Sequence, residues 1–180
     1  NERDPDEYET IIQKTGTNSR VLVIGTANVV FDGFTVTGGF QNTSGGAGGI
    51  YIGADNVAVR NCKVTGNYLN TTGAGGGGGG IYVHGFAVTS SVEISSCTIS
   101  ENIAYSSAGS SGGGGVWFRS VPATANLIFV NCTVTNNTMN GSANIYQGGG
   151  GVGMTSSGGP LLQFRNNVIT GNTAFVGRTY

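Results

Sequence analysis

The three cysteines of this 180-residue chain are spaced 35 residues apart, at positions 62, 97 and 132. One further step of 35 leads to Asn167, and asparagines recur with the same spacing at positions 67, 102, 137 and 172. A fixed period of this length is typical of repeat architectures, in which each repeat contacts mainly its neighbours. The chain is therefore predicted to be a stack of repeats.

Within each repeat, apolar residues alternate with polar ones in short runs. The runs start at Val57, Val92 and Leu127, and each continues after a two-residue corner through the cysteine to one more apolar residue. An earlier, shorter repeat of 28 residues has Phe34 in the place of Cys62. A period of two that is broken by a corner predicts two short β-strands meeting at a bend.

A third strand is predicted after each glycine run. The chain has 34 glycines, and runs of them precede the segments Ile50–Ile52, Ile81–Val83, Val116–Phe118 and Val152–Met154. Three strands that pair only with the coils above and below form a prism. The predicted fold class is all-β: a right-handed, single-stranded parallel β-helix with three short strands in each coil of about 35 residues.

The chain is predicted to be one domain, residues 1–180, with an entry segment at 1–19 and about five coils at 20–180. Five of the nine acidic residues lie in the first nine positions, so the entry segment reads as a solvated acidic arm. The whole chain has only three prolines and 9% charged residues, and only Asp32, Asp55, Glu93 and Glu101 are acidic beyond the arm. A surface so poor in charge offers little resistance to self-association.

Both ends of the predicted stack are open. Leu22 and Ile24 fit the third strand of an entering coil, whereas Leu162, Phe164 and Ile169 fill only the first two strands of the last one. Two explanations follow from this register: copies associate head to tail, as a filament, or the chain is an excerpt of a larger β-helix. The sequence leaves both open.

The repeated asparagines and cysteines are predicted to form ladders that run from coil to coil. Asn67, Asn102, Asn137 and Asn172 fall at the second corner, where amides can bond between coils. Cys62, Cys97 and Cys132 point inward as small buried hydrophobes. A disulfide between two of them would leave one thiol over. We expect no metal site and no cofactor, because no histidine or second cysteine lies nearby in the sequence.

The residue after the inward apolar position of the third strand is aromatic in three coils. Tyr51, Tyr82 and Trp117 are therefore predicted to form an outward strip, and exposed apolar strips are often contact sites. Three interpretations of this candidate contact strip stay open: a platform for carbohydrates such as surface glycans, a subunit interface, or cross-strand packing that only stabilises the sheet.

The phrase Asn28–Gly39, the Asn-Cys-x-Val-Thr-x-Asn segments and the Gly-Gly-Gly-Ile/Val strands resemble the repeats of bacterial polymorphic outer-membrane proteins. The resemblance extends from about residue 8 to the end of the chain. Those repeats build large right-handed β-helices that are secreted or displayed on cells. The resemblance thus implies a secreted, extracellular or cell-surface location and a structural or adhesive role.

Polysaccharide-cleaving enzymes, such as pectate lyases, also use this fold and are the alternative class. Their chemistry needs clustered carboxylates, which in a solenoid means acids at equal positions of neighbouring coils. Asp32 aligns instead with Arg60, as a surface ion pair, and Glu93 and Glu101 align with no other acid. His84, the single histidine, has no candidate catalytic partner nearby. The prediction is that the protein is not an enzyme.

The remaining motifs carry little functional signal. Eight scattered Lys and Arg make no basic stripe for nucleic acid, and no apolar run is long enough to span a membrane. No Lys follows the glycine runs in the pattern of a phosphate-binding loop. Asn42, Asn70 and Asn140 lie in Asn-x-Ser/Thr triplets at predicted loops and are candidate glycosylation sites.

Overall fold

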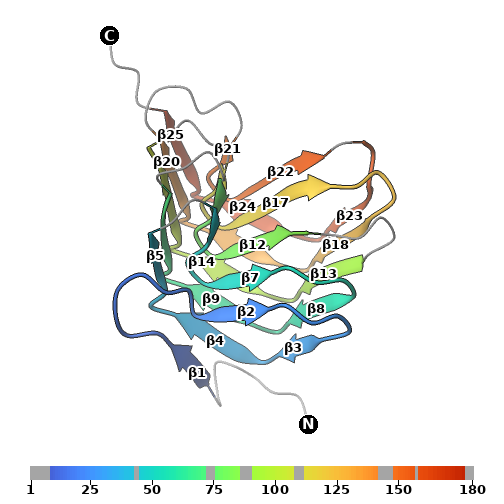
Figure 1. Cartoon of the computed structure of the whole chain (residues 1–180). Helices are drawn as coiled ribbons and strands as arrows, with labels where there is room; N and C mark the ends of the chain where they lie inside the picture. The colour runs from blue at the N-terminus through green and yellow to red at the C-terminus, as the bar shows by residue number, and fades with distance from the viewer. Residues whose placement is uncertain are drawn as a thin grey trace.

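The computed structural model describes residues 9–42, 45–71, 76–85, 91–107, 112–141, 148–156 and 158–176. This part of the chain is a β-solenoid without helices, in which 25 short strands stack into five parallel sheets (Figure 1). The coils are about 35 residues apart, as the cysteine period predicted. We number the sheets in the order in which each coil passes through them.

The first and second sheets contain the two predicted strands that meet at the cysteine corner. The first sheet is formed by β3 (Val30–Asp32), β8 (Val57–Arg60), β13 (Ser91–Ser95), β18 (Asn126–Val130) and β23 (Leu161–Arg165). The second sheet is formed by β1 (Thr10–Gln13), β4 (Phe34–Thr37), β9 (Lys63–Thr65), β14 (Thr98–Ser100), β19 (Thr133–Thr135) and β24 (Val168–Thr170).

The fifth sheet contains the predicted third strand of each coil. Its strands are β2 (Leu22–Ile24), β7 (Ile50–Ile52), β12 (Ile81–His84), β17 (Val116–Val121) and β22 (Val152–Ser156). Leu22 pairs opposite Ile50 and Ile24 opposite Ile52, in the register predicted for the entering coil.

The third and fourth sheets, to which each full coil contributes one strand, were not predicted. The third sheet consists of β5 (Phe40–Asn42), β10 (Tyr68–Thr71), β15 (Ile103–Ser106), β20 (Thr138–Gly141) and β25 (Thr173–Val176). The fourth consists of two-residue strands, β6 (Gly46–Ala47), β11 (Gly77–Gly78), β16 (Gly112–Gly113) and β21 (Gly148–Gly149). The strands of the fourth sheet are almost all glycine and have no side-chain alternation, so the sequence pattern does not predict them.

Inward residues of the first, second and fifth sheets build one continuous apolar core. It includes Ile50, Val59, Val64, Ile94 and Phe129, none of which is solvent-accessible. A separate small cluster of Leu69, Ala104 and Met139 lies inside the third sheet. Every coil thus buries its apolar face only against its neighbours, as expected for a solenoid.

Both corners around the second sheet turn through residues with positive φ. The first corner has Asn61, Ser96, Asn131 and Asn166 there, and the second has Gly66, Glu101, Asn136 and Gly171, with φ between 48° and 66°. Glycine and asparagine tolerate this left-handed conformation better than other residues. The residue that follows each turn points inward: the cysteine file at the first corner and the asparagine ladder at the second.

The asparagine ladder is a closed hydrogen-bond network between coils. The Asn102 Nδ2 donates to the Val64 carbonyl (2.8 Å), and its Oδ1 accepts from the backbone N–H of Asn67 (3.1 Å). Asn137 and Asn172 repeat this pattern one and two coils further on. The amide of each asparagine therefore satisfies corner backbone groups that the bend removes from the sheets.

Replacing Asn102 by Ala should lower the free energy of unfolding by about 3 kcal/mol, because it leaves the buried Asn67 N–H and Val64 carbonyl unpaired. Urea denaturation of the variant measures the loss. Thr98→Ala, an exposed position of the same coil, is the control and should change stability by less than about 0.5 kcal/mol. Equal effects of the two substitutions would contradict the structural role of the ladder.

Candidate functional site

The predicted contact strip lies on the outer side of the fifth sheet but is not exposed. Tyr51, Tyr82 and Trp117 stand opposite one another in the parallel register. Tyr82 is only 3% exposed and Trp117 only 1%, and Tyr51 is half-buried. The prediction of an exposed strip is therefore wrong. We call these three residues the aromatic file.

The glycine strands of the fourth sheet cover the aromatic file. Ala47 of β6 packs in one cluster with Tyr82, Trp117 and Tyr51. A Cβ at Gly78 would overlap the carbonyl of Ile81, so the backbone of β11 approaches the fifth sheet more closely than any side chain allows. The file is thus the core of a second, narrow layer between two sheets.

Polar side chains line the open side of the aromatic file. The Arg20 guanidinium lies 4.8 Å from the centre of the Tyr51 ring, and Arg119 Nη1 donates to the Tyr82 hydroxyl at 3.3 Å. Burial raises the pKa of Tyr82. His84 stacks parallel to Tyr82 at 5.7 Å, and burial, followed by the charge of Arg119, lowers its pKa. This environment disfavours the protonated imidazole.

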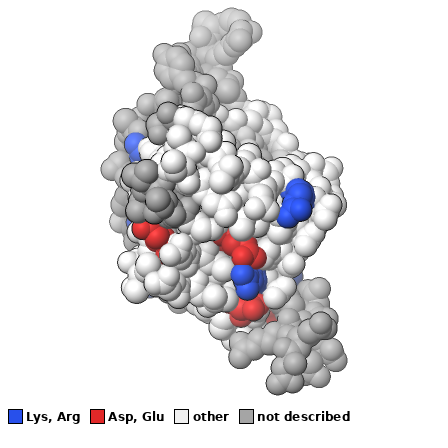
Figure 2. Space-filling model, turned by 90° about the vertical axis from the view of Figure 1, so that its right-hand side faces the viewer, with Lys and Arg blue, Asp and Glu red and all other residues white. Residues whose placement is uncertain are grey.

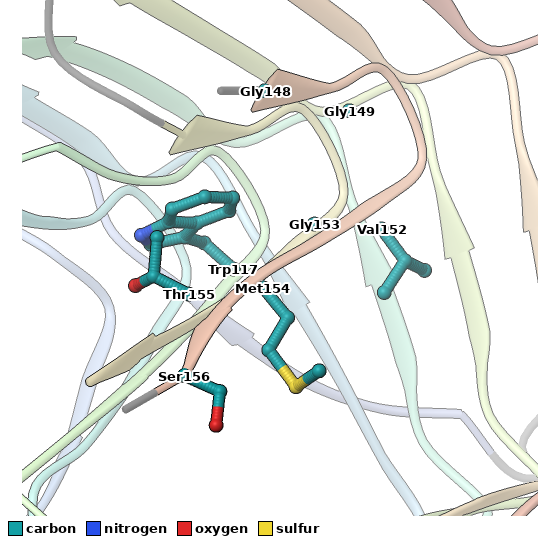
Figure 3. Close-up of a pocket in the computed structure, with 8 residues that line it drawn as sticks. All are labelled: Trp117, Gly148, Gly149, Val152, Gly153, Met154, Thr155 and Ser156. Carbon is teal, nitrogen blue, oxygen red and sulfur yellow. The ribbon is translucent and has the colours of Figure 1, made fainter. Parts of the chain in front are cut away.

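The aromatic file ends at Gly153, which pairs opposite Trp117 in the last coil. A pocket of about 430 Å³ lies at this point (Figure 3). It is lined by Trp117, Gly148, Gly149 and the strand Val152–Ser156. None of these residues carries a charge.

The three cysteines are buried in the main core as free thiols. Each thiol donates to a backbone carbonyl of the preceding coil; for Cys97 the acceptor is Val59 and for Cys132 it is Ile94, both at 3.5 Å. The thiols of Cys132 and Cys62, followed by burial, raise the pKa of Cys97. The middle thiol is therefore held protonated, which suits packing and not nucleophilic chemistry.

Asn167 occupies the next position of the cysteine file and bonds as the asparagine ladder does. Its Oδ1 accepts from the Cys132 N–H (2.9 Å), and its Nδ2 donates to the Phe129 carbonyl (2.9 Å). The first corner thus accepts either a thiol or an amide.

Replacing Cys132 by Asn should therefore change the free energy of unfolding by less than about 1 kcal/mol, because the new amide finds the Cys97 N–H and the Ile94 carbonyl as partners. Aspartate has nearly the same shape as asparagine but lacks the N–H donor of the amide. Cys132→Asp should therefore lower the free energy of unfolding by about 3 kcal/mol or more. Chemical denaturation of both variants checks this. A large loss with Asn would show that the two corners are not equivalent.

The ion pair of this surface joins Arg60 to Glu93, not to Asp32 as predicted. Arg60 donates to both Glu93 oxygens, at 3.0 and 2.6 Å, and Ser95 Oγ donates to the same carboxylate at 2.7 Å. Asp32 does stand opposite Arg60 in the register, but it accepts from the Asn61 amide instead. The long arginine side chain reaches the next coil diagonally. Figure 2 shows how few charged side chains this face carries.

Glu93→Gln should lower the free energy of unfolding by about 0.5–1 kcal/mol at neutral pH, the usual size for a partly exposed pair. The hydrogen bond from Arg60 lowers the pKa of Glu93 in the folded state. Its contribution is therefore present above the carboxyl's unfolded pKa of about 4.3 and is lost as the pH falls through the folded value.

Comparing the unfolding free energy of wild type and Glu93→Gln at neutral pH and near pH 2.5 tests this, with Glu101→Gln as the control for net charge. A difference between wild type and Glu93→Gln that persists undiminished in acid would contradict an ionic origin.

The other predicted positions are spread over the surface. Asn42, Asn70 and Asn140 lie in strands of the third sheet and not in loops. Asn42 is exposed, and the other two are half-buried. Most of the acidic arm, residues 1–8, lies outside the described residues. No group of three His, Cys, Asp or Glu side chains in the described segments could hold a metal ion.

The comparison with protein families agrees with this geometry. The model of the right-handed beta helix region matches residues 10–178, nearly the whole chain. The chain belongs to the right-handed β-helix family. This β-helix matches no curated protein and no solved structure. No helix that could cross a membrane occurs in the segments described for it.

Proposed function

We propose that this β-helix is a structural or adhesive module of a secreted or cell-surface protein, and that it works by stacking on further β-helix coils. The finer resemblance to polymorphic outer-membrane-protein repeats, carried by the Asn-Cys-x-Val-Thr-x-Asn segments, supports the extracellular location. The observation that carries the proposal is the exposed apolar end of the solenoid.

At the C-terminal end of the described stack, core positions face solvent. Leu162, Phe164 and Ile169 are 47%, 43% and 43% exposed, whereas Leu127, Phe129 and Val134, their counterparts one coil earlier, are fully buried. Phe164 still stacks parallel on Phe129, at 5.1 Å. These side chains continue the core of the preceding coils and would be buried by one more coil.

The strands at this end also have edges to which a further coil could pair. In the described structure β21 to β25 each pair with a neighbour along one edge only. Free strand edges and exposed apolar side chains together favour strand addition. Repulsion is small, because the chain carries only 9% charged residues and a net charge of -1.

The carbohydrate alternative loses the surface on which it rested, since Tyr82 and Trp117 are buried. Phe40 and Tyr68 on the third sheet are half-buried, but their rings stack on each other, 5.2 Å apart and within 4° of parallel. One face of each ring is therefore covered by the other ring. Polysaccharide cleavage has less support still: Glu93, Asp32 and Glu101 occupy different positions of their coils, and Glu93 is paired with Arg60.

The purified chain should associate with rising concentration, and Phe164→Asp should weaken this association at least tenfold by placing a charge on the apolar end. Light scattering and sedimentation give the oligomeric state, and electron microscopy shows whether assemblies are linear. Lys63→Asp, on the outer face of β9, is the control. Wild-type chains that stay monomeric at high concentration would refute association between copies and leave longer β-helices as the remaining context.

A further inference from the structure

The three thiols of the cysteine file, Cys62, Cys97 and Cys132, lie at equivalent positions of successive coils. Each Sγ lies within hydrogen-bonding distance of the carbonyl two residues before it and of one carbonyl in the preceding coil. For Cys97 these carbonyls belong to Ser95 and Val59, at 3.2 and 3.5 Å. Equivalent contacts give the three side chains the same orientation. The sulfur atoms therefore repeat along the stack with the spacing of the coils, about 4.8 Å.

This spacing is close to the span of a metal ion between two thiolates. With the length of a zinc–thiolate bond, about 2.3 Å, two collinear bonds place the sulfurs about 4.6 Å apart. A disulfide needs a much shorter separation of about 2.05 Å. Hydrogen bonds with the thiols of Cys132 and Cys62 raise the pKa of Cys97, so the middle thiol interacts with both neighbours. The file thus matches a linear dithiolate site more closely than a disulfide.

The surroundings of the cysteine file select the charge of the ion. All three thiols are at most 2% exposed and belong to the main apolar core, where an uncompensated charge is costly. A divalent ion between two thiolates is neutral overall, whereas Ag(I) or Cu(I) would leave one negative charge in the core. Zn(II) usually takes four ligands, and the described residues contain no group of three His, Cys, Asp or Glu side chains that could hold it.

We propose that two neighbouring thiols of the cysteine file bind a soft divalent metal ion that prefers linear coordination, namely Hg(II). Thiolates are soft ligands and favour soft metals. On binding, two S–H bonds break, two S–Hg bonds form and two protons are released, with no change of oxidation state. Because both possible pairs include Cys97, the chain holds one ion and keeps one free thiol. The ion links two successive coils and stabilises the folded stack.

Mercuric chloride is the probe for this site. The thiols are buried and become accessible only when coils open locally, so one equivalent is added to the folded chain for several hours and, in parallel, before refolding from urea. Excess glutathione then removes mercury that is held by a single thiol. Wild type, Cys62→Ser and Cys132→Ser should each retain one ion per chain, because each keeps one neighbouring pair. Cys97→Ser leaves two thiols about 9.6 Å apart and should retain at least tenfold less mercury.

X-ray absorption of the loaded wild type should show two sulfur neighbours at about 2.3 Å from the mercury. Circular dichroism checks that each variant is folded, and Cys97→Ala takes the place of Cys97→Ser if the serine variant is not. Equal retention by wild type and the Cys97 variant would overturn the pairing of neighbouring thiols, as would a third sulfur neighbour. Unfolding of the wild type on loading, or no retained mercury by either route, would overturn the site itself.

Discussion

The contact between equivalent corners of neighbouring coils is the interaction on which this solenoid depends. Each coil has too little interior to be stable alone, and its strands find hydrogen-bond partners only above and below. Backbone bonds between coils continue on either side of the second corner, and at the corner itself the side-chain amides of Asn67, Asn102 and Asn137 bond to the next and the previous coil. A slip by one residue would break these bonds and also turn the core outward. The ladder therefore sets the register that the apolar core then stabilises.

Much of this arrangement could be predicted from side-chain periodicity. Cysteine and asparagine recurring every 35 residues identify the corners, and alternation around Val59, Ile94 and Phe129 identifies inward positions. The third sheet carried a weaker signal of the same kind in Leu69, Ala104 and Met139, whose different sizes hide their common role. The fourth sheet carried none, because glycine has no side chain to alternate.

The aromatic file was harder to predict because backbone of the glycine strands, and not side chains, covers it. The outward direction of Tyr82 and Trp117 follows from alternation, but their burial depends on glycine strands that fold back over them. The pairing of Arg60 with Glu93 was also missed because of local geometry. The strand register places Asp32 directly opposite Arg60. The length of the arginine side chain and the hydrogen bond from Ser95 nevertheless favour the carboxylate of Glu93. Registers decide which residues are neighbours, and local geometry decides which of them interact.

The unequal lengths of the coils show where this architecture can change. The coil from Phe34 to Cys62 has 28 residues, seven fewer than the two that follow it. The deficit lies in two connections, from the third to the fourth sheet and from the fifth back to the first, while the path through both corners keeps its length. Insertions and deletions at these two connections leave the ladders untouched. Evolution can therefore lengthen them to build new surfaces on an unaltered scaffold, and loop grafting in protein engineering has the same two entry points.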